Sequence, residues 1–507
     1  MLFLFNNAAA IAVALVTSVV VWVFGGTRGD LLYHFAPWLF VFLVEVIVCF
    51  PQRHRGESTY EARERVWRAM KRDSVFWISL GLLGLLLIPF VNSGLCVFCD
   101  ARKIALGVDP APPVSFLPSC VSRIDHLNVV QWFALALATL VAVRHSLTRR
   151  GKRLVLELIA WNGLAVAVLG FVQAAAGAPG PLWCGLNGKP APGAFFATFG
   201  YPNMAGDYFT TLFGVSVALW RDRCEQVRRE LKGKDANVSA DDSRRNWFWR
   251  MHYFLIPSVI FFFAALNTLS RAAILLATST AVVYFAHTLV VSLNRMRRAR
   301  RIIVGVWSVV AFGLIVFFAS LFMPKSMQKE VDTVNTTEVL DRVSGRGQYH
   351  TRVAKEIWKD HVLFGCGGWG YQHLCMSKMT KEELKNLQGV GGSNVHNDYM
   401  QFLAEHGAVG FGAMVAIAVL LLLPIVSAWK RLVRSARFTK GKSAPPKPVQ
   451  VFALPAPVFI LLTAEVASLI HAFGDCPFRS PAVLMLFYIV LAALPGFMPK
   501  SETDLWS

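Results

Sequence analysis

The feature that most constrains the fold of this 507-residue chain is a succession of long apolar segments. A helix needs about 20 apolar residues to cross a hydrocarbon layer about 30 Å thick. Segments that approach or reach this length are 8–24, 31–50, 74–95, 127–143, 154–177, 201–220, 252–269, 271–293, 302–323, 408–428, 451–472 and 481–498. The pattern predicts an all-α polytopic membrane protein with about 12 transmembrane helices.

The composition agrees with that prediction. Hydrophobic side chains make up 55% of the chain and charged side chains only 16%, whereas soluble domains have roughly 25% charged residues. This balance excludes a soluble enzyme of several domains, and the high apolar content excludes a disordered chain.

The net charge of +20 is distributed unevenly along the chain. Of the 51 Lys and Arg residues, 34 fall in loops on one face of the predicted bundle or in the C-terminal tail. These loops are 51–73, 144–153, 221–251, 294–301 and 429–450. Cytoplasmic loops have this excess of basic residues. The charge therefore predicts that both termini lie in the cytoplasm, and it requires no nucleic acid partner.

The outer loop 324–407 is far longer than a connection between two helices requires. It has ten basic and ten acidic residues, so it is neutral. Helical signals occur within it. Tyr349, Val353 and Ile357 form one apolar stripe, and Thr380 begins a capping box. The sequence thus predicts a partly helical periplasmic loop between helices 9 and 10.

This loop divides the chain into three parts. Residues 1–323 contain helices 1–9, residues 324–407 form the long outer loop, and residues 408–507 contain helices 10–12 and a short cytoplasmic tail. Ser393 or Asn394 is expected to cap the last helix of the loop, with His396 on one face of that helix.

Seven of the nine cysteines are predicted to lie on the outer side, which fits an oxidising compartment. Cys366 and Cys375 share the outer loop and form a candidate disulfide. Cys96 and Cys99 form a single CxxC without the second motif that a zinc site requires. Structural disulfides and buried thiols remain the alternatives.

Ionisable residues within predicted spans are candidates for a function. Four acids fall in such segments, namely Glu45, Glu157, Asp207 and Glu465. The alternative for each is a hydrogen bond between helices. They do not form the regular acid relay of a proton-coupled transporter.

Arg271 lies at the expected outer end of a span, directly after the candidate N-cap residue Ser270. The N-terminus of a helix is a site for anions, because free N–H groups and the helix dipole meet there. An arginine in this turn opposes the dipole unless an anion binds. The alternative is an arginine that reaches lipid phosphate.

Arg346, Arg352 and His396 are the other candidates in the outer loop. A guanidinium group suits bidentate phosphate binding, and an imidazole suits general base catalysis near neutral pH. Taken singly, each could be a structural residue. Other histidines are nearby, but none has HExxH or HxxxH spacing, so no metal site is expected.

In order along the chain, several motifs resemble those of the O-antigen ligase family of bacterial membrane glycosyltransferases. They are Pro202-Asn203 with Gly206, Ser270-Arg271-Ala272, Gly345-Arg346 with His361 to Gly367, His396-Asn397 with Gly407 and Gly410, and Asp475-Cys476-Pro477. The resemblance covers about residues 195–495. Val362 stands where the family usually has proline, and His350 where an aromatic residue is common.

The resemblance implies transfer of a glycan from undecaprenyl diphosphate to an acceptor hydroxyl, without a cofactor or metal and with inversion. His396, Arg271 and Arg346 would be catalytic. The substrate-binding residues would be Arg352, Asn397, Asn203 and Ser270. The first choice of acceptor is lipid A-core, which defines an O-antigen ligase. A polymerase, an O-linked protein oligosaccharyltransferase and a transporter of the lipid-linked glycan are the alternatives.

Overall fold

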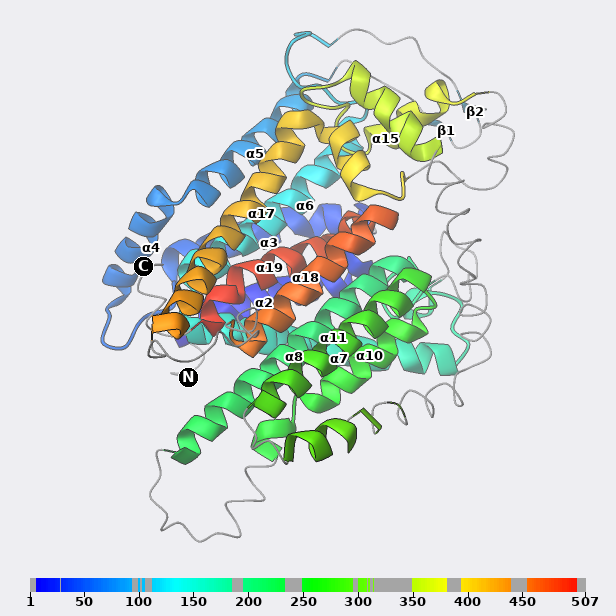
Figure 1. Cartoon of the computed structure of the whole chain (residues 1–507). Helices are drawn as coiled ribbons and strands as arrows, with labels where there is room; N and C mark the ends of the chain where they lie inside the picture. Colours follow the sequence, from blue (N-terminus) through cyan, green and yellow to red (C-terminus); the bar gives the residue numbers. More distant parts are fainter. Residues whose placement is uncertain are drawn as a thin grey trace.

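The computed structural model describes most of the chain. The described residues are 6–27, 29–93, 99–100, 103–104, 112–184, 195–232, 249–294, 300–307, 309–310, 313, 349–380, 394–438 and 454–498. Within them the fold is helical (Figure 1), apart from one antiparallel pair of two-residue strands, β1 (Cys99–Asp100) and β2 (Lys103–Ile104).

Eight helices in the described part of the chain are long and apolar enough to cross a membrane. They are α3 (Gly29–Cys49), α5 (Ser74–Val91), α6 (Arg123–Val141) with the π-helical turn η2 (Ala142–Ser146), α7 (Arg149–Ala175), the segment ending in α10 (Leu255–Asn267), α11 (Arg271–Asn294), α17 (Asp398–Phe438) and α18 (Ala456–Gly474). The apolar helices α2 (Ala8–Trp22) and α19 (Pro481–Ala493) are shorter.

A multi-pass helical membrane protein is therefore confirmed. The count of twelve spans stays a prediction, because most of segment 302–323 lies outside the described residues and α8 (Pro202–Lys232) is not among the eight. The basic loop 51–73 contains a further helix, α4 (Thr59–Arg72), which begins at a capping box of Ser58 and Glu61.

The core of the bundle surrounds α19, in which every residue is buried. A helix that is apolar on all sides is stable only when neighbours cover all of it. In α19 those neighbours are α2, α6, α8 and α18 (Figure 1). Helix α18 also packs along α8, and this pairing decides which polar residues meet at the helix ends.

Part of the long loop forms a small layer at one end of the bundle (Figure 1). It contains the helical residues 349–360, α15 (Gly370–Leu374) and the short helix η4 (Cys375–Lys378). The predicted stripe is confirmed, because Val353 and Ile357 are fully buried in this layer. The expected capping box after Thr380 extends into residues 381–393, outside the described residues.

Backbone hydrogen bonds join this layer to the bundle. The Gly368 N–H donates to His126 Nδ1 of α6 at 2.8 Å. The Cys366 and Gly367 N–H groups donate to the carbonyls of Ala404 and Glu405 in α17, at 3.0 and 2.9 Å. The small layer is therefore positioned by α17, the helix that begins directly after His396 and Asn397.

Gly407 interrupts α17 with φ 63° and ψ −174°. The break lets the Ala408 N–H donate to the Val362 carbonyl at 2.9 Å and the Val409 N–H donate to the Leu363 carbonyl at 3.0 Å. A Cβ atom on Gly407 would lie 2.3 Å from the Leu363 carbonyl. Glycine is needed here both for its positive φ and for this close approach.

Replacing Gly407 with alanine is expected to destabilise the protein by about 3 kcal/mol, because strain at this φ adds to the backbone clash. Thermal unfolding in detergent measures the loss. Gly412→Ala is the matched control, since Gly412 lies in the same helix and no atom would contact its Cβ. Equal unfolding temperatures for the two variants would contradict the prediction.

The candidate disulfide is wrong, because Cys366 is a free thiol. Both Cys366 and Cys375 are buried within the small layer formed by the outer loop. Each thiol packs among apolar side chains there, so burial in the layer rather than a covalent bond accounts for these cysteines.

A buried polar cluster joins α8 to α18. His471 Nδ1 lies 3.0 Å from Asp207 Oδ1, and Ser468 Oγ donates to the other carboxylate oxygen at 3.0 Å. Thr211 Oγ1 lies 3.0 Å from Ser468 Oγ. Asp207 thus makes the hydrogen bonds between helices that the sequence left as the alternative to a function.

Candidate active site

His396 lies just before α17 rather than within a helix. The helix begins at Asp398, and Asn397 caps it, because Asn397 Oδ1 accepts a hydrogen bond from the Met400 N–H at 3.1 Å. The expected cap at Ser393 or Asn394 is therefore wrong by three or four residues. His396 has φ 55°, a conformation that is uncommon for residues other than glycine and that concentrates at functional sites.

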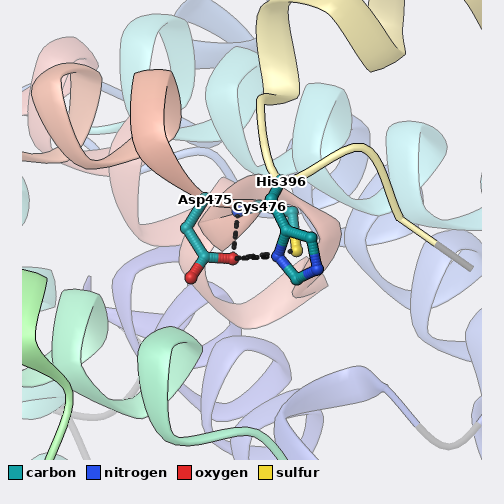
Figure 2. Close-up of side chains that lie close together, drawn as sticks. All are labelled: His396, Asp475 and Cys476. Atoms are coloured by element: carbon teal, nitrogen blue, oxygen red, sulfur yellow. Dashed lines mark hydrogen bonds and ion pairs between the residues drawn. The ribbon is translucent and has the colours of Figure 1, made fainter. Parts of the chain in front are cut away.

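The imidazole of His396 faces Asp475, the residue that ends α18 (Figure 2). Its Nδ1 lies 3.3 Å from Asp475 Oδ1. The His396 side chain is 40% exposed and that of Asp475 is 9% exposed. One ring edge is thus fixed by a buried carboxylate, while the rest of the ring is accessible to a substrate.

Asp475 is oriented by donors at the start of α8 and in its own loop. The Tyr201 hydroxyl donates to Asp475 Oδ1 at 3.2 Å, and Asn203 Nδ2 donates to Oδ2. The Cys476 N–H donates to Oδ1 at 2.8 Å. Asn203, a predicted site residue, thus contacts the carboxylate that faces His396.

The surroundings of Asp475 favour its ionised form. Burial raises the pKa of the carboxyl, but His396, His471 and the Cys476 N–H more than offset this, and the pKa lies below its ordinary value. An ionised carboxylate can only accept a hydrogen bond, so Nδ1 of His396 carries the proton of the neutral ring. Nε2 then has the free lone pair of a general base.

Arg271 is the first residue of α11, and Ser270 is its N-cap as predicted. Ser270 Oγ accepts a hydrogen bond from the Ala273 N–H at 3.3 Å. The preceding residue, Leu269, has φ 58°, so the backbone is strained where it enters the helix.

The first turns of α8 and α11 lie side by side. A Cβ atom on Gly206 would lie 2.4 Å from Ala273 Cβ and 3.4 Å from Ser270 Cβ. Gly206 follows Asn203 by less than one helical turn. The contact at Gly206 therefore brings the Arg271 end of α11 next to the helix end that supports Asp475.

The remaining sequence candidates differ in position. Arg352 is exposed, and its Nη2 donates to the Lys378 carbonyl at 3.4 Å. The ring centroids of His350 and His396 lie 6.1 Å apart. The helical residues 349–360, which include His350 and Arg352, therefore lie beside the candidate base. Arg346 lies outside the described residues.

A buried ion pair lies near the candidate general base, His396. Arg479 donates to both carboxylate oxygens of Glu405, at 2.6 and 3.2 Å, and its guanidinium lies 3.8 Å from the centroid of the Trp369 ring. Gln401 donates to Glu405 Oε1 at 3.1 Å and accepts from the Val395 N–H at 3.0 Å. The network reaches the residue next to His396.

A second contact fixes the two chain segments of the site. Asp398 Oδ2 accepts from the Phe478 N–H at 2.8 Å, and the Asp398 N–H donates to the Asp475 carbonyl at 3.2 Å. These two hydrogen bonds therefore hold the start of α17 against the loop after α18. Sequence reasoning named Asp475 only as part of a motif, and an acid at the outer end of an apolar helix was the available signal.

Residues 256–415 match the family model described as O-antigen ligase. Over this stretch the chain is similar to the O-antigen ligase family. Together with the apolar helices, the match supports a multi-pass membrane glycosyltransferase of the O-antigen ligase and polymerase type. The match contains Arg271, Arg346, Arg352 and His396, whereas Asn203 and Asp475 lie outside it and join the site through the fold. No curated protein matches the chain.

Proposed function

We propose that this protein transfers a glycan from undecaprenyl diphosphate to a hydroxyl of lipid A-core, at the outer surface of the bacterial inner membrane. The observation that carries the proposal is the His396–Asp475 pair beside the first turns of α8 and α11. It combines a general base with an anion-binding helix end, which are the two groups that this transfer needs.

In the proposed reaction, Nε2 of His396 takes the proton from the acceptor hydroxyl. The acceptor oxygen then bonds to the anomeric carbon of the glycan, from the side opposite the leaving group. The bond from that carbon to the diphosphate oxygen breaks, and its electron pair goes to the diphosphate. The configuration inverts, and no cofactor or metal takes part.

The leaving diphosphate gains negative charge beside the membrane. Arg271 and the N–H groups at the start of α11 would neutralise it, with Arg346 as the second cation. Arg352, Asn203, Asn397 and Ser270 are the proposed substrate-binding residues. The contacts of Asn203, Asn397 and Ser270 favour an indirect part for these three, through Asp475 and the two helix starts.

Arg271→Gln is expected to lower the turnover number about a hundredfold, because one preorganised charge at the leaving group is lost. Arg271→Lys should recover part of the loss, since it keeps the charge without the bidentate geometry. Turnover with a purified lipid-linked glycan measures both. A glutamine variant as active as wild type would remove Arg271 from the mechanism.

Asp475→Asn is expected to lower turnover tenfold to a hundredfold, because an amide no longer selects the ring tautomer with Nε2 free. Because the pKa of the carboxyl is lowered, the carboxylate stays ionised throughout the range from about pH 5 to about pH 8. The ratio of wild-type to variant turnover should thus stay above one across this range. A ratio that falls to one at the acidic end of this range would contradict the assignment.

The function is tested by the envelope glycans of a deletion strain, analysed by gel and mass spectrometry. A ligase predicts full-length glycan on the lipid carrier and none on lipid A-core. Single repeats on lipid A-core would instead indicate the polymerase, and loss of protein glycosylation would indicate the oligosaccharyltransferase. Failure of the lipid-linked glycan to reach the outer leaflet would support the transporter.

A further inference from the structure

Three potential metal ligands converge at the site. They are Nδ1 of His396, a carboxylate oxygen of Asp475 and Sγ of Cys476, and all three atoms lie within 4.8 Å of one another (Figure 2). The sequence separation of 79 residues between His396 and Asp475 hides this set from any search for spaced motifs. The loop after α18 and the residue before α17 bring it together.

The spacing of these atoms suits one small ion. Asp475 Oδ1 lies 3.3 Å from His396 Nδ1 and 3.3 Å from Cys476 Sγ. Two ligands on a tetrahedral zinc ion, with bonds of about 2.0 to 2.3 Å, are themselves about 3.3 to 3.5 Å apart. Two of the three separations therefore fit one ion, and the third, from His396 Nδ1 to Cys476 Sγ, is at most 4.8 Å.

The donor types also select the metal. One imidazole nitrogen, one carboxylate oxygen and one thiolate sulfur suit Zn²⁺, which accepts all three, and they do not suit Mg²⁺, which prefers six oxygens. A thiolate and a carboxylate together balance the charge of the ion, which reduces the cost of placing it at a largely buried position.

The surroundings prepare the carboxylate for such a ligand. Tyr201 and Asn203 fix Asp475 from the α8 side, as outer hydrogen-bond partners do for metal-ligating carboxylates. Cys476 is fully buried, and His396 is the most exposed of the three residues.

We propose that His396, Asp475 and Cys476 form a binding site for one zinc ion, with the fourth position open, and that zinc inhibits the enzyme there. On binding, the Cys476 thiol loses its proton to solvent, and the Nδ1 proton of His396 moves to Nε2. The inhibitory part rests on the proposed function, because Nε2 then carries a proton and cannot accept one from the hydroxyl.

The test is calorimetric titration of the purified full-length protein with Zn²⁺. Cys96→Ser/Cys99→Ser serves as the background, so that the CxxC contributes nothing. One ion per chain is expected, and Mg²⁺ should give no binding. Cys476→Ala and His396→Ala should each weaken zinc binding at least about a hundredfold. Cys184→Ala, which removes an exposed thiol elsewhere, should leave it unchanged.

Two further readouts separate this site from the proposed function. Co²⁺ in place of zinc should give thiolate-to-metal absorption that Cys476→Ala abolishes. Zinc should inhibit transfer in the background protein. In Cys476→Ala, the rate is compared with the rate of the same variant without zinc. Inhibition of that variant should require at least about a hundredfold more zinc.

The outcomes distinguish the two claims. Undiminished zinc binding in Cys476→Ala, or no binding in the background protein, would overturn the site and leave the proposed transfer reaction intact. Binding that depends on Cys476 but does not slow transfer would keep the site, overturn the inhibition and contradict His396 as the general base. Binding and inhibition that are both lost in Cys476→Ala support both claims.

Discussion

His396→Ala is expected to lower turnover by a factor of about 10³ to 10⁴, because a positioned general base contributes up to this range. The variant should still bind the lipid-linked glycan, since the proposed diphosphate site lies at Arg271 and the start of α11. Single-turnover transfer measures the chemical step, and binding of the donor is measured separately. This contrast between binding and turnover is the signature of a catalytic residue.

The control for this experiment is His54→Ala. His54 is an exposed histidine in the loop 51–73, away from the site, and its replacement should leave turnover unchanged. Added imidazole should partly restore the His396 variant, because the cavity and Asp475 remain. Full activity of His396→Ala, or a loss of donor binding equal to the loss of turnover, would reject the general base. Full activity would also revive the transporter alternative.

Glu405→Gln is expected to destabilise the protein by about 3 to 5 kcal/mol, because it leaves the charge of Arg479 buried without its partner. Both side chains of the pair are at most 1% exposed. The same loss is expected for Arg479→Met. The midpoint of thermal unfolding in detergent, for wild type and both variants, measures the change.

The double variant Glu405→Leu/Arg479→Met should recover most of this stability, since two apolar side chains leave no buried charge. Glu356→Gln is the matched surface control, because its pair with Lys359 is exposed and such pairs contribute about 0 to 1 kcal/mol. If the double variant is less stable than either single variant, the ion pair is not the source of the loss.

The pair also has a consequence for activity. Gln401 connects Glu405 to the backbone of Val395, the residue before His396. The double variant should therefore fold but transfer glycan more slowly than wild type, since the strained backbone at His396 loses one of its supports. The loss of turnover would then be separate from the loss of stability.

The local features of this chain were predictable from its sequence. The apolar segments indicated membrane helices, the stripe of Tyr349, Val353 and Ile357 indicated a helix, and Ser270 was recognised as an N-cap. Each depends on contacts within a few turns of one helix, which the order of residues fixes directly. The family too was apparent, because its motifs are short and occur in order.

The site itself was decided by tertiary structure. His396 contacts Asp475 because the start of α17 lies beside the end of α18, and Asn203 joins them because α8 packs along α18. The break at Gly407 and the burial of Cys366 and Cys375 likewise depend on how the small outer layer packs against α17. Contacts between segments so far apart follow from helix packing, which no spacing of residues along the chain encodes. The sequence therefore determined the helices, the family and the candidate base, whereas the packing of helix ends decided its partner.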